Sequence, residues 1–140
     1  GDGSTESPSG DVHQKASSMQ VRLAYAGHVA VEGWGVGSLF DFAGDATKRA
    51  RTVTLIGIHN PSLLWLEWCH NDWFMERWAN AAAFGTGYAA FLDAVHTAYP
   101  SLRIVAQTAV LRVADSTLQD YRDQISTAAA ARTTRTPGAL

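Results

Sequence analysis

Hydrophobic positions in the second half of the chain alternate between strand-like runs and helix-like spacings. Residues 62–68 are almost continuously apolar, which is typical of a parallel strand covered on both faces. A helix is predicted next, ending before Pro100, and residues 102–111 predict another strand. A last helix is expected to end near Ala131. The helical spacing rests on Phe84, Tyr88, Phe91, Leu92 and Val95, and then on Leu118, Tyr121 and Ile125.

The first third of the chain gives weaker signals. Residues 1–18 are small and polar, with Gly, Ser and Pro throughout, and they predict a loop. Residues 19–26 predict a short helix, which Gly27 would end. Residues 28–32 alternate as in a strand. These expectations place a strand before the glycine-rich segment that follows.

Residues 33–37 contain three glycines and predict a loop with unusual torsions or close backbone approach. Ser38 can cap a helix that begins at Leu39. Residues 51–58 fit either a strand, because Val, Thr and Ile favour one, or a helix continuing from Ala46. We favour the helix.

Strands that alternate with helices at these distances predict an α/β fold with an open parallel sheet and helices on both faces, a three-layer αβα arrangement. We expect one domain over residues 1–140, with a polar tail at 132–140. In such sheets a ligand crevice lies at the carboxyl ends of the strands. The loops that follow Val31, Trp68 and Leu111 are therefore the places to look for a site.

Composition narrows the classes of function. The 140 residues carry a formal net charge of −2 with no clustered basic patch, so a nucleic-acid partner is not expected. The sequence has no apolar run near the roughly 20 residues of a membrane-spanning helix and no signal-peptide core, so we expect a soluble chain with no membrane partner, its compartment open. Cys69 is the only cysteine and cannot form an internal disulfide. No cofactor is expected.

The segment SLLWLEWCHNDW at 62–73 resembles the block of SGNH hydrolases (GDSL-like esterases) in which a strand ends in Gly-x-Asn-Asp. Asn71 and Asp72 match this motif, whereas Cys69 stands at the glycine. YPSLRIVAQT at 99–108 is similar to the next strand of the family with its Tyr-Pro entry. VEGWGVGSL at 31–39 is similar to the family's glycine loop, and GDGSTE at 1–6 resembles its Gly-Asp-Ser-x-Thr opening.

The resemblance implies a flavodoxin-like fold and hydrolysis of an acyl or acetyl ester, with a carbohydrate-linked ester among the options. It places the oxyanion donors at Asn71 and Gly35, with Gly37 as second candidate for the loop donor. A side-chain amide and a glycine turn are also common in ordinary loops, so a purely structural role stays open for both. Substrate contacts are expected from Trp34, Asp72 and Trp73. Trp78 could also face the crevice, whereas Trp65 and Trp68 are expected in the core.

The catalytic residues of the family are only partly matched. Gly3 stands at the nucleophile position, and Ser4 beside it is the candidate nucleophile. The family's Asp-x-x-His block is not found, and its first strand precedes the opening motif, so both would be missing here. We therefore expect little activity from the printed chain. The alternative is a catalytically inactive remnant that binds a ligand, or that self-associates through unpaired sheet edges.

His70 could belong to two further kinds of site. A thiol-imidazole pair with Cys69 is disfavoured, because adjacent strand residues point to opposite faces. A metal site with Asp72 would have correct facing on extended backbone, but zinc needs a third ligand that the sequence does not supply. We therefore expect no metal site, and we interpret His70 as a loop residue.

Overall fold

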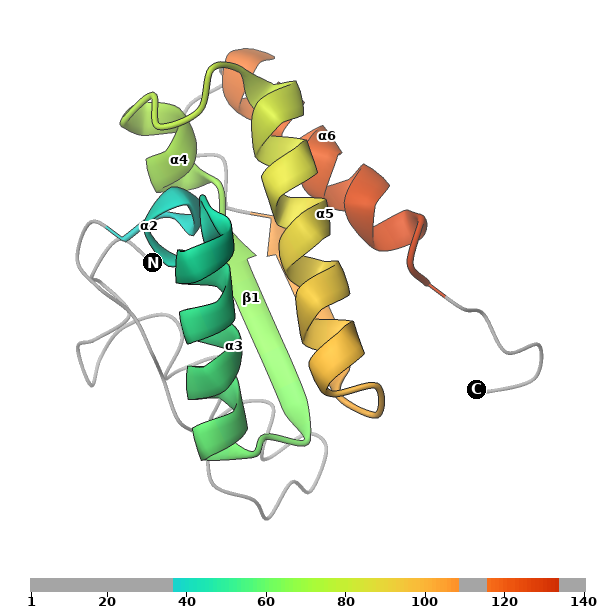
Figure 1. The fold of residues 1–140 in the computed structure, drawn as a ribbon. Coiled ribbons are helices and arrows are strands. Elements are labelled where there is room, and N and C mark those ends of the chain that lie inside the picture. Colours follow the sequence, from blue (N-terminus) through green and yellow to red (C-terminus); the bar gives the residue numbers. More distant parts are fainter. Residues whose placement is uncertain (1–36, 109–115, 134–140) are drawn as a thin grey trace, which may run out of the picture.

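The computed structural model describes residues 37–108 and 116–133, and Figure 1 shows their arrangement. Five helices and two strands follow one another along this part of the chain. Their bounds are α2 Leu39–Ala43, α3 Ala46–His59, β1 Leu63–Trp68, α4 His70–Phe74, α5 Ala81–Ala98, β2 Arg103–Thr108 and α6 Ser116–Ala130. The predicted elements within residues 1–36 lie outside the described residues.

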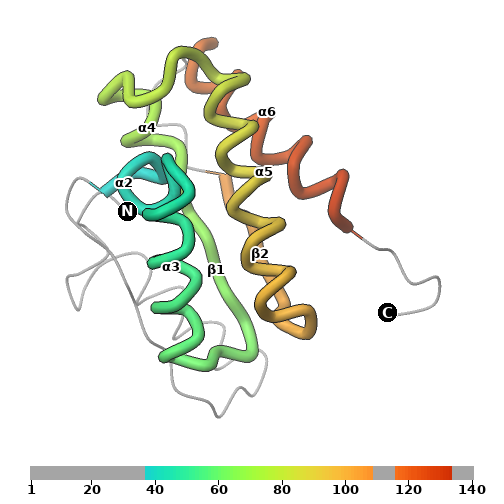
Figure 2. Tube along the Cα trace, viewed as in Figure 1, coloured from blue at the N-terminus to red at the C-terminus, as the bar shows by residue number. Residues whose placement is uncertain are grey.

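The two strands form a parallel pair, as the alternation of strands and helices predicts. Leu63 pairs with Arg103 at one end and Trp68 with Thr108 at the other. Figure 2 shows both strands side by side behind α3 and α5. The described residues thus form a mixed α/β structure around a two-stranded parallel sheet.

Local sequence accounts for the first helices. Ser38 is extended and accepts from Asp41 N, while the Asp41 carboxylate accepts from Ser38 N, so the two form a capping box at the start of α2. Asp45 caps α3 through Lys48 N, and Asn60 ends α3 in the left-handed conformation. The ambiguous residues 51–58 lie inside α3, which confirms the helix that we favoured.

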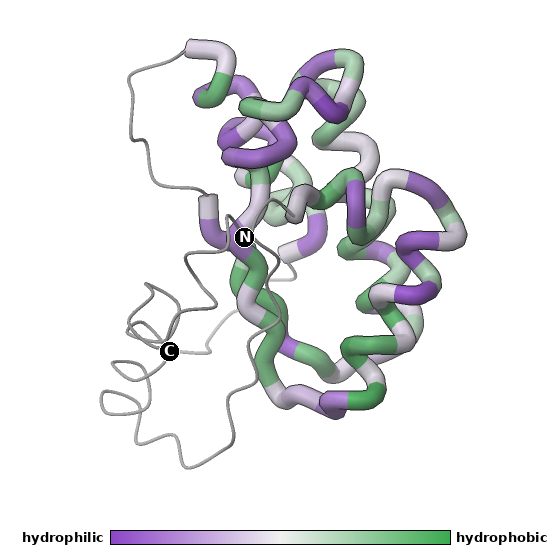
Figure 3. Tube along the Cα trace, turned by 90° about the vertical axis from the view of Figure 1, so that its left-hand side faces the viewer, coloured by the Kyte–Doolittle hydropathy of each residue, from purple (hydrophilic) through white to green (hydrophobic). Residues whose placement is uncertain are grey.

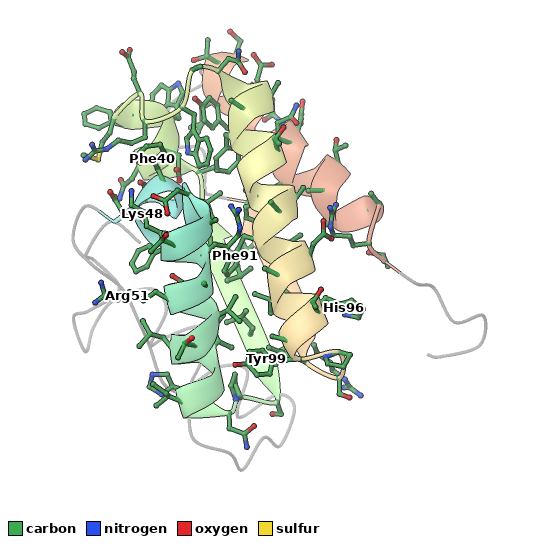
Figure 4. The ribbon with its side chains drawn as sticks, in the orientation of Figure 1. Phe40, Lys48, Arg51, Phe91, His96 and Tyr99 are labelled. Atoms are coloured by element: carbon green, nitrogen blue, oxygen red, sulfur yellow. The ribbon has the colours of Figure 1, made fainter. Side chains whose placement is uncertain are left out.

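The hydrophobic core lies between the sheet and the helices in front of it. Leu66 of β1, Ile56 of α3 and Phe91 of α5 are buried in one cluster. Figure 4 shows Phe91 pointing toward the interior between α3 and α5. In the side view of Figure 3, hydrophobic and hydrophilic residues alternate along the helices, as expected for helices that bury one side.

The prediction that β1 is covered on both faces is wrong for Trp65. Its side chain is 39% exposed, and its indole nitrogen donates to Gln107 Oε1 at 2.9 Å. Val105 on the neighbouring strand is 38% exposed. Trp68, by contrast, packs against Phe91 with ring centroids 5.2 Å apart, as predicted for a core residue. A continuous apolar run marks a strand, but it does not report how many of its faces are covered.

Candidate functional site

The residues that follow β1 form the centre of the candidate site. β1 ends at Trp68, the chain turns at Cys69, and α4 begins at His70. Asn71, Asp72 and Trp73 therefore share one short helix at the carboxyl end of the strand, the edge at which ligands bind in parallel sheets.

Cys69 makes the turn from β1 into α4 with a backbone that side chains rarely adopt. Its φ is 118° and its ψ is −26°, a conformation that glycine reaches without a steric penalty. The thiol is buried, with 1% of the residue exposed. The sequence places Cys69 where the resembled motif has glycine, and the backbone at that position is of the kind glycine favours.

The side chain of Asn71 links α4 to the segment before α2. Its amide nitrogen donates to the carbonyl oxygen of Gly37 at 2.9 Å, across 34 positions of sequence. A side-chain amide nitrogen carries two N–H groups, and the bond to Gly37 uses one of them. The end of the glycine-rich segment and the Asn71 block therefore lie in direct contact.

Asp72 is fully buried, and both of its carboxylate oxygens accept hydrogen bonds. Leu39 N donates to Oδ2 at 2.9 Å, and Phe40 N donates to Oδ1 at 3.1 Å. The indole nitrogen of Trp78 donates to Oδ1 at 2.6 Å. Burial raises the pKa of Asp72 above its ordinary value, against the opposing effect of these three donors.

Trp78 is held in place by the aromatic side chains around it. Its ring meets Phe40 edge-on at 5.3 Å and Phe84 edge-on at 6.1 Å. It also lies against Gly87 of α5, where an added Cβ would collide with the indole ring. A larger residue than glycine at 87 would therefore displace the donor that contacts Asp72.

A second aromatic group lies on the outer side of α4. The ring of His70 lies 5.8 Å from Trp73 and stacks at 6.4 Å on Phe74, which is 70% exposed. The indole nitrogen of Trp73 donates to Thr117 Oγ1 at 2.7 Å and so connects α4 to the start of α6. Exposed stacked rings of this kind offer a flat surface to a sugar or acyl group.

The structure brings together part of the predicted site. Asn71 contacts Gly37, and Asp72 contacts Leu39 and Phe40. The strand predicted before them, residues 28–32, lies outside the described residues. Trp73 lies on the same helix. The other predicted site residues, Gly3, Ser4, Trp34 and Gly35, lie outside the described residues, and their roles stay predictions.

The interpretation of His70 as a loop residue is wrong, because it is the first residue of α4. The i, i+2 facing expected for His70 and Asp72 on extended backbone is also absent, since residues two apart on a helix point in different directions. No group of three metal-ligating side chains occurs within residues 37–108 and 116–133.

The sequence carries no signal for the two backbone partners of Asp72. Leu39 and Phe40 donate through backbone N–H groups, which any residue except proline carries.

The sequence predicts Tyr88 only as a core residue. Its buried hydroxyl has no hydrogen-bond partner in the described structure, and burial and the nearby Cys69 thiol raise its pKa.

Comparison with protein families, with curated proteins and with solved structures finds no match to this chain. Within the described residues, no helix is both long and apolar enough to cross a membrane.

Proposed function

We propose that this chain is an ester hydrolase of the SGNH type with a three-layer, flavodoxin-like fold. The observation that carries the proposal is the hydrogen bond from the Asn71 side chain to the Gly37 carbonyl. It joins the two segments that the resemblance assigns to the oxyanion hole, although 34 positions separate them. The glycine-type backbone at Cys69 gives independent support, because the resembled motif has glycine there.

The proposed reaction is acyl transfer from a small-molecule or carbohydrate ester to water. Ser4 is the proposed nucleophile, whose proton would pass to a base that no residue of this chain is assigned to supply, and Asn71 and Gly35 are the proposed donors to the tetrahedral oxyanion. Loss of one such donor typically costs about 3 kcal/mol of transition-state stabilisation. Trp34 and Trp73 are proposed to hold the acyl or sugar part of the ester.

Fluorophosphonate labelling followed by intact mass tests this proposal. The probe adds covalently only to a serine that is activated by a base and an oxyanion hole. A single adduct that maps to Ser4 supports the hydrolase. Folded protein without an adduct contradicts it.

A matched pair of variants tests the donor. Asn71→Ala should lower the rate of p-nitrophenyl acetate hydrolysis by about a hundredfold. Asn60→Gly is the control, because Asn60 ends α3 just before β1 begins, away from the carboxyl end, in a left-handed conformation that glycine tolerates. Equal rates for the two variants would remove Asn71 from the proposed mechanism.

The second candidate is a catalytically inactive domain that binds a ligand. Gly3 at the nucleophile position favours it, and so does the exposed ring of Phe74 stacked on His70. In that case acetylated sugars should change tryptophan fluorescence with no turnover, and Trp73→Phe should reduce the change. Trp65→Phe is the control, because Trp65 lies on β1 and bonds to β2.

A further inference from the structure

We infer that Asp72 is a positioning residue, which fixes the start of α2 and the adjoining Gly37 against Asn71 without contacting the substrate. The expected effect on the rate of hydrolysis rests on the proposed function, whereas the expected effects on amide exchange and on the Asn71 signals rest on the structure alone. The sequence predicts a substrate contact for Asp72. The structure gives its two oxygens three donors from the protein itself and leaves the residue with no exposed surface.

Asn71 and Asp72 of α4 together bind the stretch from Gly37 to Phe40 at neighbouring points. Asn71 donates to Gly37, and Asp72 accepts from Leu39 and Phe40, which follow Gly37 by two and three positions. One bond alone would allow the segment to pivot. Three bonds from adjacent residues fix both its distance from α4 and its direction.

The charge and burial of Asp72 make this connection hard to replace. A buried carboxylate is stable only when donors satisfy its oxygens, and hydrogen bonds to an ionised group are stronger than those between neutral groups. Leu39 and Phe40 supply N–H groups of the first turn of α2, which have no partner inside the helix. The carboxylate thus satisfies the start of α2 while it holds α2 against α4.

Trp78 adds the third donor and orients the carboxylate. Its indole nitrogen lies 2.6 Å from Oδ1, and its ring is fixed between Phe40 and Phe84. The Trp78 ring therefore contacts the ring of Phe40, whose backbone nitrogen donates to the same oxygen. Displacement of any one of these residues would change the position of the others.

Asp72→Asn is the first test, because asparagine keeps the shape but presents an NH₂ group to one of the backbone donors. In folded variant protein, amide hydrogen exchange at Leu39 and Phe40 should accelerate by about tenfold or more, with exchange in α5 nearly unchanged. The NMR signals of the Asn71 side-chain amide should shift. For p-nitrophenyl acetate, kcat should fall by about tenfold with KM within roughly twofold.

Asp45→Asn is the matched control, because Asp45 also accepts from a helix N–H, lies exposed at the start of α3 and loses the same charge. It should leave all three readouts unchanged. Unaltered exchange at Leu39 and Phe40, or unshifted Asn71 signals, in folded Asp72→Asn protein would overturn the inference. An equal acceleration across α5 would also overturn it, because it would report general loss of stability.

The readouts separate this inference from the proposed function. Wild-type protein that shows no turnover would contradict the hydrolase, while the exchange and the Asn71 signals would still decide the role of Asp72. Should Asp72→Asn fail to fold, Trp78→Phe removes one donor and keeps the carboxylate. It should accelerate exchange at Leu39 and Phe40 by about two- to fivefold. Unchanged exchange would overturn the inference.

Discussion

The backbone at Cys69 predicts that glycine is more stable than alanine there, the reverse of what is found at an ordinary buried position. At an ordinary buried position alanine is more stable than glycine, by about 0.5–1 kcal/mol from chain entropy and by a further ~0.8 kcal/mol from the buried carbon. At Cys69, with φ of 118°, a Cβ should instead cost up to about 3 kcal/mol of strain. Cys69→Gly should therefore be more stable than Cys69→Ala by about 1 kcal/mol.

Both variants lose the buried sulfur, so their comparison isolates the effect of the Cβ. Urea unfolding followed by tryptophan fluorescence measures the difference as a shift in midpoint at unchanged slope. Ala43→Gly is the control, because Ala43 is buried in helix α2 and the same change should destabilise there by about 1 kcal/mol or more. Equal stability of the two Cys69 variants, or greater stability of Cys69→Ala, would refute the strain.

Three further predictions concern buried and charged groups. Tyr88→Phe should raise the free energy of unfolding by about 1 kcal/mol, because it removes a buried hydroxyl with no partner in the described structure. Tyr99→Phe, measured beside it by urea unfolding, should lower the free energy of unfolding by about 1 kcal/mol, because the Tyr99 hydroxyl donates to the carbonyl of residue 53 in α3, toward which Figure 4 shows it directed. Changes of the same sign in the two variants would contradict this reasoning. Asp93 forms two bonds with Arg132, and its pKa is lowered by that pair, so Asp93→Asn should lose about 0.5 kcal/mol at neutral pH. The loss should fade as the pH falls below the ordinary value of 3.8, and a loss that persists in acid would contradict the pairing. The raised pKa of Asp72 acts in the opposite direction, because the folded state binds the proton more tightly than the unfolded state. The free energy of unfolding of wild type relative to Asp72→Asn should therefore fall as the pH rises above 3.8. A pH-independent difference in urea unfolding would contradict the raised pKa.

The sequence by itself determined most of the described local elements, with α4 as the exception. Ser38 caps α2, Asp45 and Asn60 bound α3, and Pro100 follows the end of α5, each through a property of the residue and its nearest neighbours. The apolar runs predicted both strands, and the alternation of elements predicted their parallel pairing. These features follow from sequence because capping, torsional preference and periodicity act over a few residues.

The resemblance to a Gly-x-Asn-Asp block predicts a role for Asn71 and Asp72, and the apolar run before them predicts their place at the carboxyl end of a strand. Only the tertiary structure showed that Asp72 is buried and that two of its three donors are backbone N–H groups 32 and 33 positions away. Backbone donors carry no signature in the sequence, because nearly every residue has one.

The exposure of Trp65 and the torsion at Cys69 were also decided by the tertiary structure. An apolar strand residue is buried only if another layer covers its face, and the pattern within the strand cannot report this. A cysteine gives no warning of a positive φ, since its own preference is for negative values. The positive φ occurs at the turn between β1 and α4, and such a conformation persists only where the surrounding structure holds it.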